Sequence, residues 1–344
     1  ETAVEIVEAE IAHINLEGRH VATTGGNIFS FDYLVIALGS VVSTYGIPGV
    51  QDYAYKFKTI EDGLILADKI EELYSGRGRG EKSLPVKIIL GGAGFTGVEL
   101  AAELSNCVVH MVRRYKIVPQ NCSSITLIEA GPAMLPAISE AERGMIKNRL
   151  TQLGVNILEN APIAEVGPDF ARLKDGRKIE GDLIIWSAGV GASELVKQIS
   201  GLELDNRDRI MVDEHLRAKN HADIFAIGDA MIFVDPKNQK PVPQLAYAAI
   251  EQGRVAAGNI SRLIKTGNDR QLARLAAYKP FYSVWIAPVG GKYAIAHVGN
   301  WTFSGYLGYL VRQIVDFRYF LTTLPILKAI KLFLTDVRVF AKND

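Results

Sequence analysis

The stretch VKIILGGAGFTGVELAAEL, residues 86–104, decides the fold. It opens with a continuous apolar run typical of a buried strand and ends with residues that favour a helix. Between them, Gly92, Gly94 and Gly97 form a GxGxxG pattern. Glycines at this spacing let the backbone turn tightly and approach a pyrophosphate at the N-terminus of the helix. We therefore predict a strand, a phosphate-binding turn and a helix.

Strand and helix patterns alternate on the C-terminal side of this turn. The runs 125–128 and 155–158 are apolar enough for strands, and helical composition over 140–153 separates them. Two later segments, DLIIWSAGV (182–190) and DIFAIGDA (223–230), each place an apolar strand directly before a glycine. Strand ends of this kind can face a cofactor. The alternation predicts an α/β fold with a second unit of this type.

The N-terminal side has a different pattern. Apolar and polar residues alternate over 4–14 and 20–31, which predicts a small antiparallel unit, and YLVIAL (33–38) reads as a buried strand closed by Gly39. Helical spacing over 59–73 is followed by the glycine-rich SGRGRGEK, residues 75–82. We interpret that glycine-rich segment as a hinge between nucleotide-binding domains.

Composition excludes several classes of protein. With 38 basic and 38 acidic side chains, the 344-residue chain has no charge excess for nucleic acid. Its two cysteines, Cys107 and Cys122, form no CxxC pair, which argues against a disulfide framework. The six histidines show no metal-ligand spacing. We predict neither a metal site nor a nucleic-acid partner.

Glu129 ends the strand that follows the glycine turn. A carboxylate at this place accepts hydrogen bonds from the adenosine ribose and repels a 2′-phosphate, which favours NADH over NADPH. Glu129 lies 37 residues beyond Gly92, where about 20 is usual. The alternative is a solvated glutamate at a strand end.

Five sequence blocks together resemble one family. They are YLVIALGS (33–40), GGAGFTGVELAAEL (91–104), ITLIEAGPAMLP (125–136), IIWSAGV (184–190) and IFAIGDA (224–230). In this order, over essentially the whole chain, they resemble type II NADH dehydrogenases, which are membrane-bound NADH:quinone oxidoreductases. The resemblance implies two Rossmann-like dinucleotide-binding domains, for FAD and NADH, plus a C-terminal amphipathic helical membrane-binding element.

The start of the chain departs from the family pattern. Members open with an earlier GxGxxG that binds the ADP half of FAD, and none stands before Tyr33. We expect about two further βα units, each of roughly 30 residues, to precede Glu1. The predicted division is 1–58 and 187–281 for the two parts of an FAD-binding domain, 59–186 for an NADH-binding domain, and 282–344 for a membrane-associated region.

The resemblance also implies two sets of cofactor-binding residues. Asp229 would hydrogen-bond the ribityl or pyrophosphate part of FAD, although a helix N-cap or turn aspartate is the alternative. The implied FAD residues are Ala37, Leu38, Gly39, Gly228, Asp229 and Ala246. The implied NADH residues are Gly91, Gly92, Gly94, Thr96, Gly97, Glu129, Ala188, Gly189 and Val190.

Glu99 is the candidate catalytic residue, because a glutamate about one turn into this helix lies near the nicotinamide and the flavin in the family. Its role would be electrostatic or proton-coupling, and the alternative is a glutamate favoured by the helix macrodipole. The family's quinone motif AQxAxQQG aligns with AYAAIEQG, residues 246–253. Tyr247 and Glu251 replace two glutamines there, and with Gln252 they are the candidate quinone residues. A helix-core role for Tyr247 remains open.

Residues 303–340 are rich in aromatic and branched side chains interrupted by basic ones. The uncharged run Tyr319 to Leu327 falls far below the roughly 20 residues that span a bilayer. Basic residues spaced through apolar helices fit an element lying in the membrane interface. FSGYLGYL, residues 303–310, resembles the start of the family's membrane-binding region. The alternative is an amphipathic packing or dimer helix.

The implied function is FAD-dependent oxidation of NADH with two-electron reduction of a membrane quinone, without proton pumping. The implied location is peripheral, at the cytoplasmic face of the membrane, and a homodimer is an open alternative. Sulfide:quinone oxidoreductase is the nearest rival, but it relies on a redox-active cysteine pair near the flavin, and Cys107 and Cys122 lie in the wrong segment. Other rivals are a soluble NAD(P)H oxidase or disulfide reductase and a catalytically silent NAD-sensing scaffold.

Overall fold

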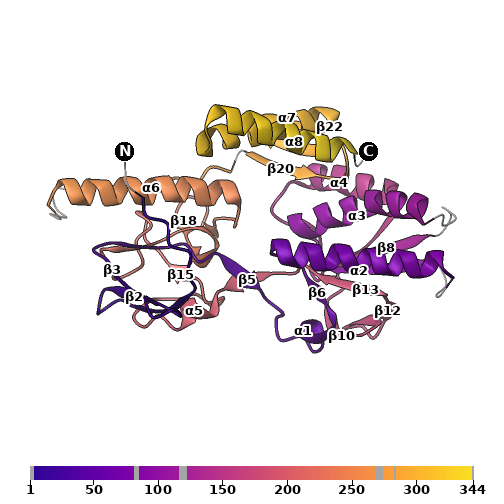
Figure 1. Cartoon of the computed structure of the whole chain (residues 1–344), viewed down its shortest axis with the longest axis horizontal. Helices are drawn as coiled ribbons and strands as arrows, with labels where there is room; N and C mark the ends of the chain where they lie inside the picture. The colour runs from indigo at the N-terminus through magenta and orange to yellow at the C-terminus, as the bar shows by residue number, and fades with distance from the viewer. Residues whose placement is uncertain (1–3, 81–84, 116–121, 268–273, 283, 343–344) are drawn as a thin grey trace. The chain divides into compact units, whose positions relative to one another are not determined.

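The computed structural model describes residues 4–80, 85–115, 122–267, 274–282 and 284–342. The chain divides into two units, each made of two separate stretches (Figure 1). Unit 1 comprises Glu1–Val41 and Val190–Phe281. Unit 2 comprises Val42–Gly189 and Tyr282–Asp344.

Unit 2 is built on a parallel five-stranded sheet in the order β6-β13-β7-β8-β9. A second, antiparallel sheet has the order β10-β11-β12. The strands are β6 Tyr55–Lys56, β7 Val86–Gly91, β8 Ser123–Ile128, β9 Val155–Leu158, β10 Ile163–Gly167, β11 Phe170–Leu173, β12 Lys178–Glu180 and β13 Leu183–Trp186. The helices of this stretch are α1 Val50–Tyr53, α2 Ile60–Gly78, α3 Phe95–Arg114 and α4 Glu140–Gln152.

The central strand β7 is apolar apart from Lys87, because both of its faces are buried. Ile88 and Leu90 join the apolar cluster that includes Val98 of α3. Ile89, between them, joins the cluster that includes Ile163 of β10. Alternate side chains therefore fix the strand from both sides, and the glycine turn that follows starts from a rigid position.

The C-terminal region packs within unit 2. Its antiparallel strands are β20 Val284–Pro288, β21 Ala294–Val298 and β22 Trp301–Gly305, followed by the helices α7 Tyr306–Thr323 and α8 Ile326–Lys342. Ala287 and Ile295 of this sheet belong to the same buried cluster as the residues of α3. The rings of Phe317 and Phe333 lie 4.8 Å apart and join α7 to α8. Within the described ranges, no helix combines the length and apolar character needed to cross a membrane.

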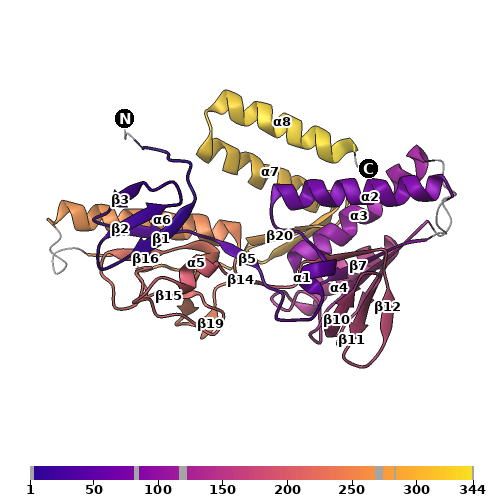
Figure 2. The same cartoon turned by 60° about the horizontal axis from the view of Figure 1, so that its bottom comes forward.

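Unit 1 contains an antiparallel sheet, β1-β2-β3, and a parallel pair, β4 and β16 (Figure 2). The predicted N-terminal antiparallel unit is thus confirmed. The strands are β1 Ile11–Asn15, β2 His20–Thr23, β3 Ile28–Ser30, β4 Leu34–Ile36, β5 Ser40–Val42, β14 Val190–Ala192, β15 Ile210–Met211, β16 Ile224–Ala226, β17 Met231–Ile232, β18 Val234–Asp235 and β19 Lys240–Pro241. The helices are α5 Glu194–Lys197, the 3₁₀ turn η1 Gly228–Ala230 and α6 Ala246–Lys265.

Two sequence-based boundaries need correction. Residues 42–58 join unit 2 rather than the first part of the FAD-binding domain, because β6 pairs with β13. The proposed hinge, residues 75–82, begins inside a helix, since α2 continues to Gly78 and Arg77 is buried. The segment also lies within one unit, and its residues 81 and 82 fall outside the described ranges.

Candidate dinucleotide and flavin sites

The glycine turn between β7 and α3 admits no side chain at two positions. Gly92 has φ +102°, and a Cβ there would lie 2.5 Å from the Cα of Ala188. A Cβ at Gly97 would lie 1.9 Å from the carbonyl oxygen of Gly92. The helix therefore begins directly against the turn, as a phosphate-binding backbone requires.

Glu129 holds this turn in place. One carboxylate oxygen accepts a hydrogen bond from the backbone N–H of Ala93 at 3.0 Å, and the other accepts from the N–H of Gly131 at 2.7 Å. Ser187, directly after β13, supports the same turn, because its hydroxyl donates to the carbonyl oxygens of Gly91 and Gly92 at 3.1 and 3.0 Å. The turn is thus ordered by the protein itself.

A cavity of about 480 Å³ opens beside the turn, within the usual range for ligand pockets. Six predicted NADH residues line it, namely Gly91, Gly92, Gly94, Glu129, Ala188 and Gly189. Thr96 and Gly97 lie in the first turn of α3 and do not line the cavity, and Val190 begins β14 in unit 1. The other lining residues, among them Tyr45, Lys174 and Trp186, were not predicted from the sequence. Tyr45 and Lys174 come from segments that carry no motif, whereas Trp186 lies in the block 184–190, where only the residues next to the glycine were selected.

Glu99 stands on α3, half-buried, one turn beyond the glycines. Burial raises the pKa of its carboxyl group to about 7; the guanidinium of Arg312 on α7 opposes this rise, and the negative charge of Glu103 adds to it. Among the described residues, no hydrogen-bond donor contacts the Glu99 carboxylate. A carboxyl group in this state can take up or release a proton near neutral pH.

In unit 1, the parallel strands β4 and β16 end side by side, and a left-handed glycine follows each. Gly39 has φ +65° and Gly228 has φ +68°. The hydroxyl of Ser40 donates to a carboxylate oxygen of Asp229 at 2.7 Å. Ala37 and Leu38 complete the end of the first strand. This arrangement of strand ends, open glycine backbone and one carboxylate suits the sugar and phosphate groups of a flavin nucleotide.

Helix α6 begins at Ala246 and supports the flavin segment through Gln252. The buried amide of Gln252 accepts from the N–H of Gly228 at 2.8 Å and donates to the hydroxyl of Tyr278 at 3.4 Å. Tyr247 donates its hydroxyl to the carbonyl oxygen of Phe281 at 2.8 Å. Glu251 pairs with Arg254 on the same helix. Gln252 therefore holds the turn at Gly228 in position.

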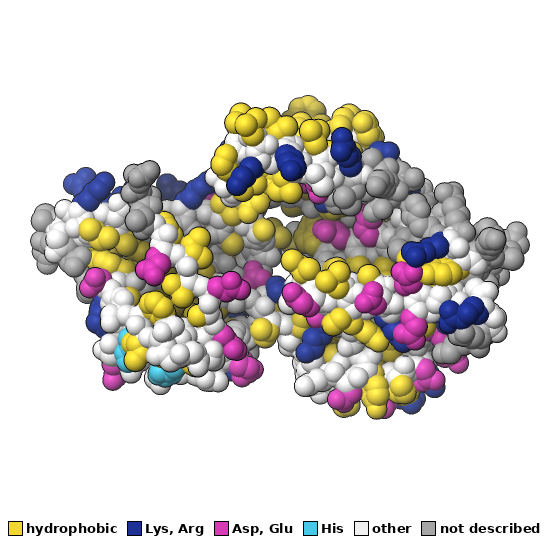
Figure 3. Space-filling view, viewed as in Figure 1, with side chains coloured by type: hydrophobic (Ala, Val, Ile, Leu, Met, Phe, Trp, Pro, Cys, Tyr) yellow, Lys and Arg dark blue, Asp and Glu magenta, His cyan; other side chains and the backbone are white. Residues whose placement is uncertain are grey.

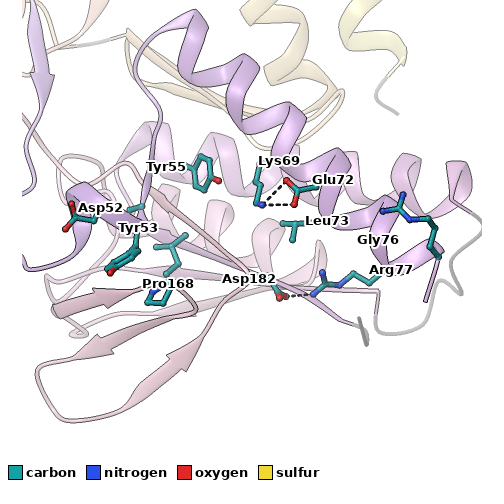
Figure 4. Close-up of a pocket in the computed structure, with 13 residues that line it drawn as sticks. Asp52, Tyr53, Tyr55, Lys69, Glu72, Leu73, Gly76, Arg77, Pro168 and Asp182 are labelled. Atoms are coloured by element: carbon teal, nitrogen blue, oxygen red, sulfur yellow. Dashed lines mark hydrogen bonds and ion pairs between the residues drawn. The ribbon is translucent and has the colours of Figure 1, made fainter. Parts of the chain in front are cut away.

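A second hollow in unit 2, of about 680 Å³, lies between α2 and the edge of the parallel sheet (Figure 4). Two ion pairs occupy it. The Lys69 ammonium lies 2.9 Å from the Glu72 carboxylate, and the Arg77 guanidinium lies 2.7 Å from the Asp182 carboxylate. Because these charges already neutralise one another, we assign no ligand to this hollow.

The free Cys122 precedes β8, and the side chain of Cys107 lies outside the described part of the chain.

Comparison with known proteins identifies the class of protein. The family model described as pyridine nucleotide-disulphide oxidoreductase matches residues 1–253. The class is therefore that of an α/β oxidoreductase with the FAD/NAD-type fold. Two solved structures share this fold. NDH2 from Plasmodium falciparum in complex with NADH is 20% identical with a TM-score of 0.83, covering 96% of this chain and 82% of that one. The sulfide:quinone oxidoreductase from Aquifex aeolicus is 18% identical with a TM-score of 0.73, covering 92% and 74%.

Curated relatives narrow the class. The type II NADH:quinone oxidoreductase of Staphylococcus saprophyticus is 33% identical over 269 residues, covering 76% of this chain and 65% of the relative. That of Staphylococcus aureus is 31% identical over 304 residues, covering 85% and 75%. The chain belongs to the type II NADH:quinone oxidoreductases of the pyridine nucleotide-disulphide oxidoreductase family. The resemblance seen in the sequence is thereby confirmed.

Proposed function

We propose that the protein oxidises NADH with bound FAD and passes two electrons to a membrane quinone. The observation that carries this proposal is the cavity in unit 2, where the glycine turn and Glu129 lie together at the end of the parallel sheet. The turn would bind the pyrophosphate of NADH, and Glu129 would bind the adenosine ribose. The end of the cavity formed by Ala188 and Gly189 would receive the nicotinamide.

The chain's own residues supply binding and proton handling. Bound FAD would accept the hydride and release its electrons to the quinone. Gly39, Gly228 and Asp229 would hold it, supported by Gln252. Reduction of a quinone to a quinol by NADH consumes one proton beyond the hydride, and Glu99, with a pKa of about 7, is the carboxyl group suited to exchange it. Tyr247 and Glu251 remain our candidates on the quinone side.

The test is anaerobic reduction of the FAD-loaded protein, followed by addition of quinone. NADH should bleach the flavin absorbance rapidly, NADPH should act far more slowly because Glu129 repels its 2′-phosphate, and quinone should restore the absorbance. Bleaching by sulfide in place of NADH would contradict the proposal and favour sulfide:quinone oxidoreductase, whose fold this chain shares. A flavin that no donor bleaches would favour the silent scaffold.

We also propose that the α7–α8 hairpin binds the membrane surface, on the cytoplasmic side. Apolar side chains cover this hairpin, and lysine and arginine side chains lie among them (Figure 3). The exposed apolar residues of the hairpin are Tyr306, Leu307, Leu310, Ile314, Val315, Tyr319, Leu321, Ile326, Leu327, Ile330, Leu332 and Leu334. Apolar side chains that enter the interface, with cations beside anionic headgroups, are the features of a helix that lies in the interface.

Co-sedimentation with vesicles tests this surface. Replacing Lys328 and Lys331 by glutamate should release the protein from vesicles that contain anionic lipid, because each cation near such a surface contributes about 1 kcal/mol. Lys240→Glu on β19 in unit 1 is the matched control and should leave binding unchanged. Equal binding by the hairpin variant and the control would contradict a membrane role for the hairpin and favour packing or dimerisation.

A further inference from the structure

Tyr45 lies at the end of the dinucleotide cavity formed by Ala188 and Gly189. It lines the cavity together with Gly92 and Glu129, although it is more than 40 residues away in the sequence. Its hydroxyl lies only 1.9 Å from the place where a Cβ of Gly189 would stand. Gly189 has φ +77°, so its backbone conformation also favours glycine. The missing side chain makes room for Tyr45.

The backbone holds Tyr45 in this place from both sides. On one side, the N–H of Ser43 donates to the carbonyl oxygen of Gly189 at 3.3 Å, and the indole N–H of Trp186 donates to the carbonyl oxygen of Ser43 at 2.9 Å. On the other side, the carbonyl oxygen of Pro48 accepts from the N–H of Val166 at 2.9 Å. Residues 43–48 therefore form a strap whose ends are fixed to the walls of unit 2.

Tyr45 occupies an unfavourable backbone conformation at the middle of this strap. Its φ is +50° and that of Gly46 is +66°, so two consecutive residues are left-handed. A non-glycine residue in this region costs on the order of 1 kcal/mol, and such residues gather at ligand sites. The side chain does not recover this cost by burial, since 57% of Tyr45 is exposed. The strap keeps a large aromatic ring at the mouth of the cavity.

We infer that Tyr45 positions the nicotinamide of bound NADH by packing its ring against the nicotinamide ring. This inference rests on the proposed function, since it takes NADH as the ligand of the cavity. An aromatic ring with an open face can stack on a planar heterocycle and exclude water from it. The Tyr45 hydroxyl fills the space that a side chain of Gly189 would take, so the tyrosine ring borders the end of the cavity where the nicotinamide would lie. Tyr45 would thus orient the carbon that gives up the hydride.

Two ligands that differ only in the nicotinamide part can distinguish a direct contact of Tyr45 with NADH from a structural role of Tyr45. Dissociation constants for NADH and for ADP-ribose, which lacks the nicotinamide, are measured by anaerobic calorimetry on wild type and on Tyr45→Ala with the flavin already reduced, so that it cannot accept a hydride. The substitution should weaken NADH binding about three- to tenfold, the worth of one aromatic pair, and leave ADP-ribose binding unchanged. Tyr45→Phe keeps the ring and should bind both ligands as wild type does. Tyr53→Ala, at an exposed tyrosine outside this cavity, is the matched control.

Two results would overturn the inference. If Tyr45→Ala weakens both ligands equally, Tyr45 only supports the strap, and if it weakens neither, the ring makes no contact with NADH. Steady-state kinetics add a second readout, because loss of the contact in the bound state should raise KM for NADH, and Tyr45→Phe should restore it. Failure of wild type to bind NADH is a separate result, which would overturn the proposed function itself.

Discussion

Two glutamates of unit 2, Glu99 and Glu142, have carboxyl groups with opposite pKa shifts. Glu142 accepts hydrogen bonds from the hydroxyl and N–H of Ser139 at 2.6 and 3.1 Å and from the hydroxyl of Thr302 at 3.0 Å, and its carboxylate lies 2.7 Å from the ring of His297. Burial alone would raise its pKa, but the hydrogen bonds from Ser139, Thr302 and His297 lower it below the usual value. Glu99 has no such donor within the described ranges, and its pKa is raised to about 7.

The difference shows that burial raises the pKa of a carboxyl group unless hydrogen-bond donors outweigh it. Glu142 caps α4 and ties it to β21 and β22, so its charge is fixed and its role is structural. Glu99 is left with one opposing cation and one like charge, so its proton is available near neutral pH. Only the arrangement around Glu99 suits a residue that exchanges protons during catalysis.

The largest expected effect is on catalysis at Glu99. Glu99→Gln keeps the shape of the side chain and removes the exchangeable proton, so turnover with NADH and quinone should fall about a hundredfold, the lower range for a lost general acid or base. Stopped-flow measurement of the reductive and oxidative half-reactions would show which step slows. Glu142→Gln is the control and should retain turnover under conditions where it is folded. Unchanged half-reactions in Glu99→Gln would end the catalytic assignment.

The next effect is on stability at Glu142. Glu142→Ala leaves Ser139, Thr302 and His297 without their shared acceptor, so the free energy of unfolding should fall by about 2–3 kcal/mol. Urea denaturation followed by circular dichroism measures the change. Glu140→Ala lies in the same first turn and is exposed, so it should cost far less. Equal losses in the two variants would mean that helix electrostatics, rather than the hydrogen-bond network, stabilises this region.

The smallest effects are the opposite pH slopes of the two sites. The folded pKa of Glu142 is lowered, so its contribution to stability is complete above the unfolded pKa of about 4.5 and is lost as pH falls below it. The folded pKa of Glu99 is raised, so the folded state holds the proton longer and loses stability as pH rises from about 4.5 through 7. Relative to wild type, Glu99→Gln should therefore gain urea resistance between pH 5 and 8, by roughly 1–3 kcal/mol. A flat difference over this range would contradict the raised pKa.

The sequence predicted the elements that depend on local pattern. The glycine turn, the strand ended by Glu129 and the helix over 140–153 follow from apolar runs and turn residues, and the structure has each of them. The segment at 75–82 misled because its glycines suggested a hinge. Burial of Tyr74 and Arg77 keeps the helix intact there, and such long-range packing leaves no local signal.

Contacts between residues that are far apart in the sequence could not be predicted either. Tyr45 reaches the cavity through hydrogen bonds of its neighbours to residues more than 100 positions away, and Glu142 meets Thr302 across 160 residues. Gln252 was predicted to be a quinone residue because it belongs to the aligned quinone motif, residues 246–253. In the fold, its side chain is buried against Gly228 instead of facing outward. A motif shows which residues belong together in the sequence, but the packing decides which of them face a site and which support the fold.

The bond between Gln252 and Gly228 has a practical meaning for mutagenesis. It joins the second turn of α6 to the 3₁₀ turn that contains Asp229. If this turn binds FAD as proposed, a substitution at Gln252 would weaken FAD binding before it changed the affinity for quinone. The amount of flavin bound per protein should therefore be measured before any rate. It distinguishes a variant that has lost FAD from one whose quinone site has changed.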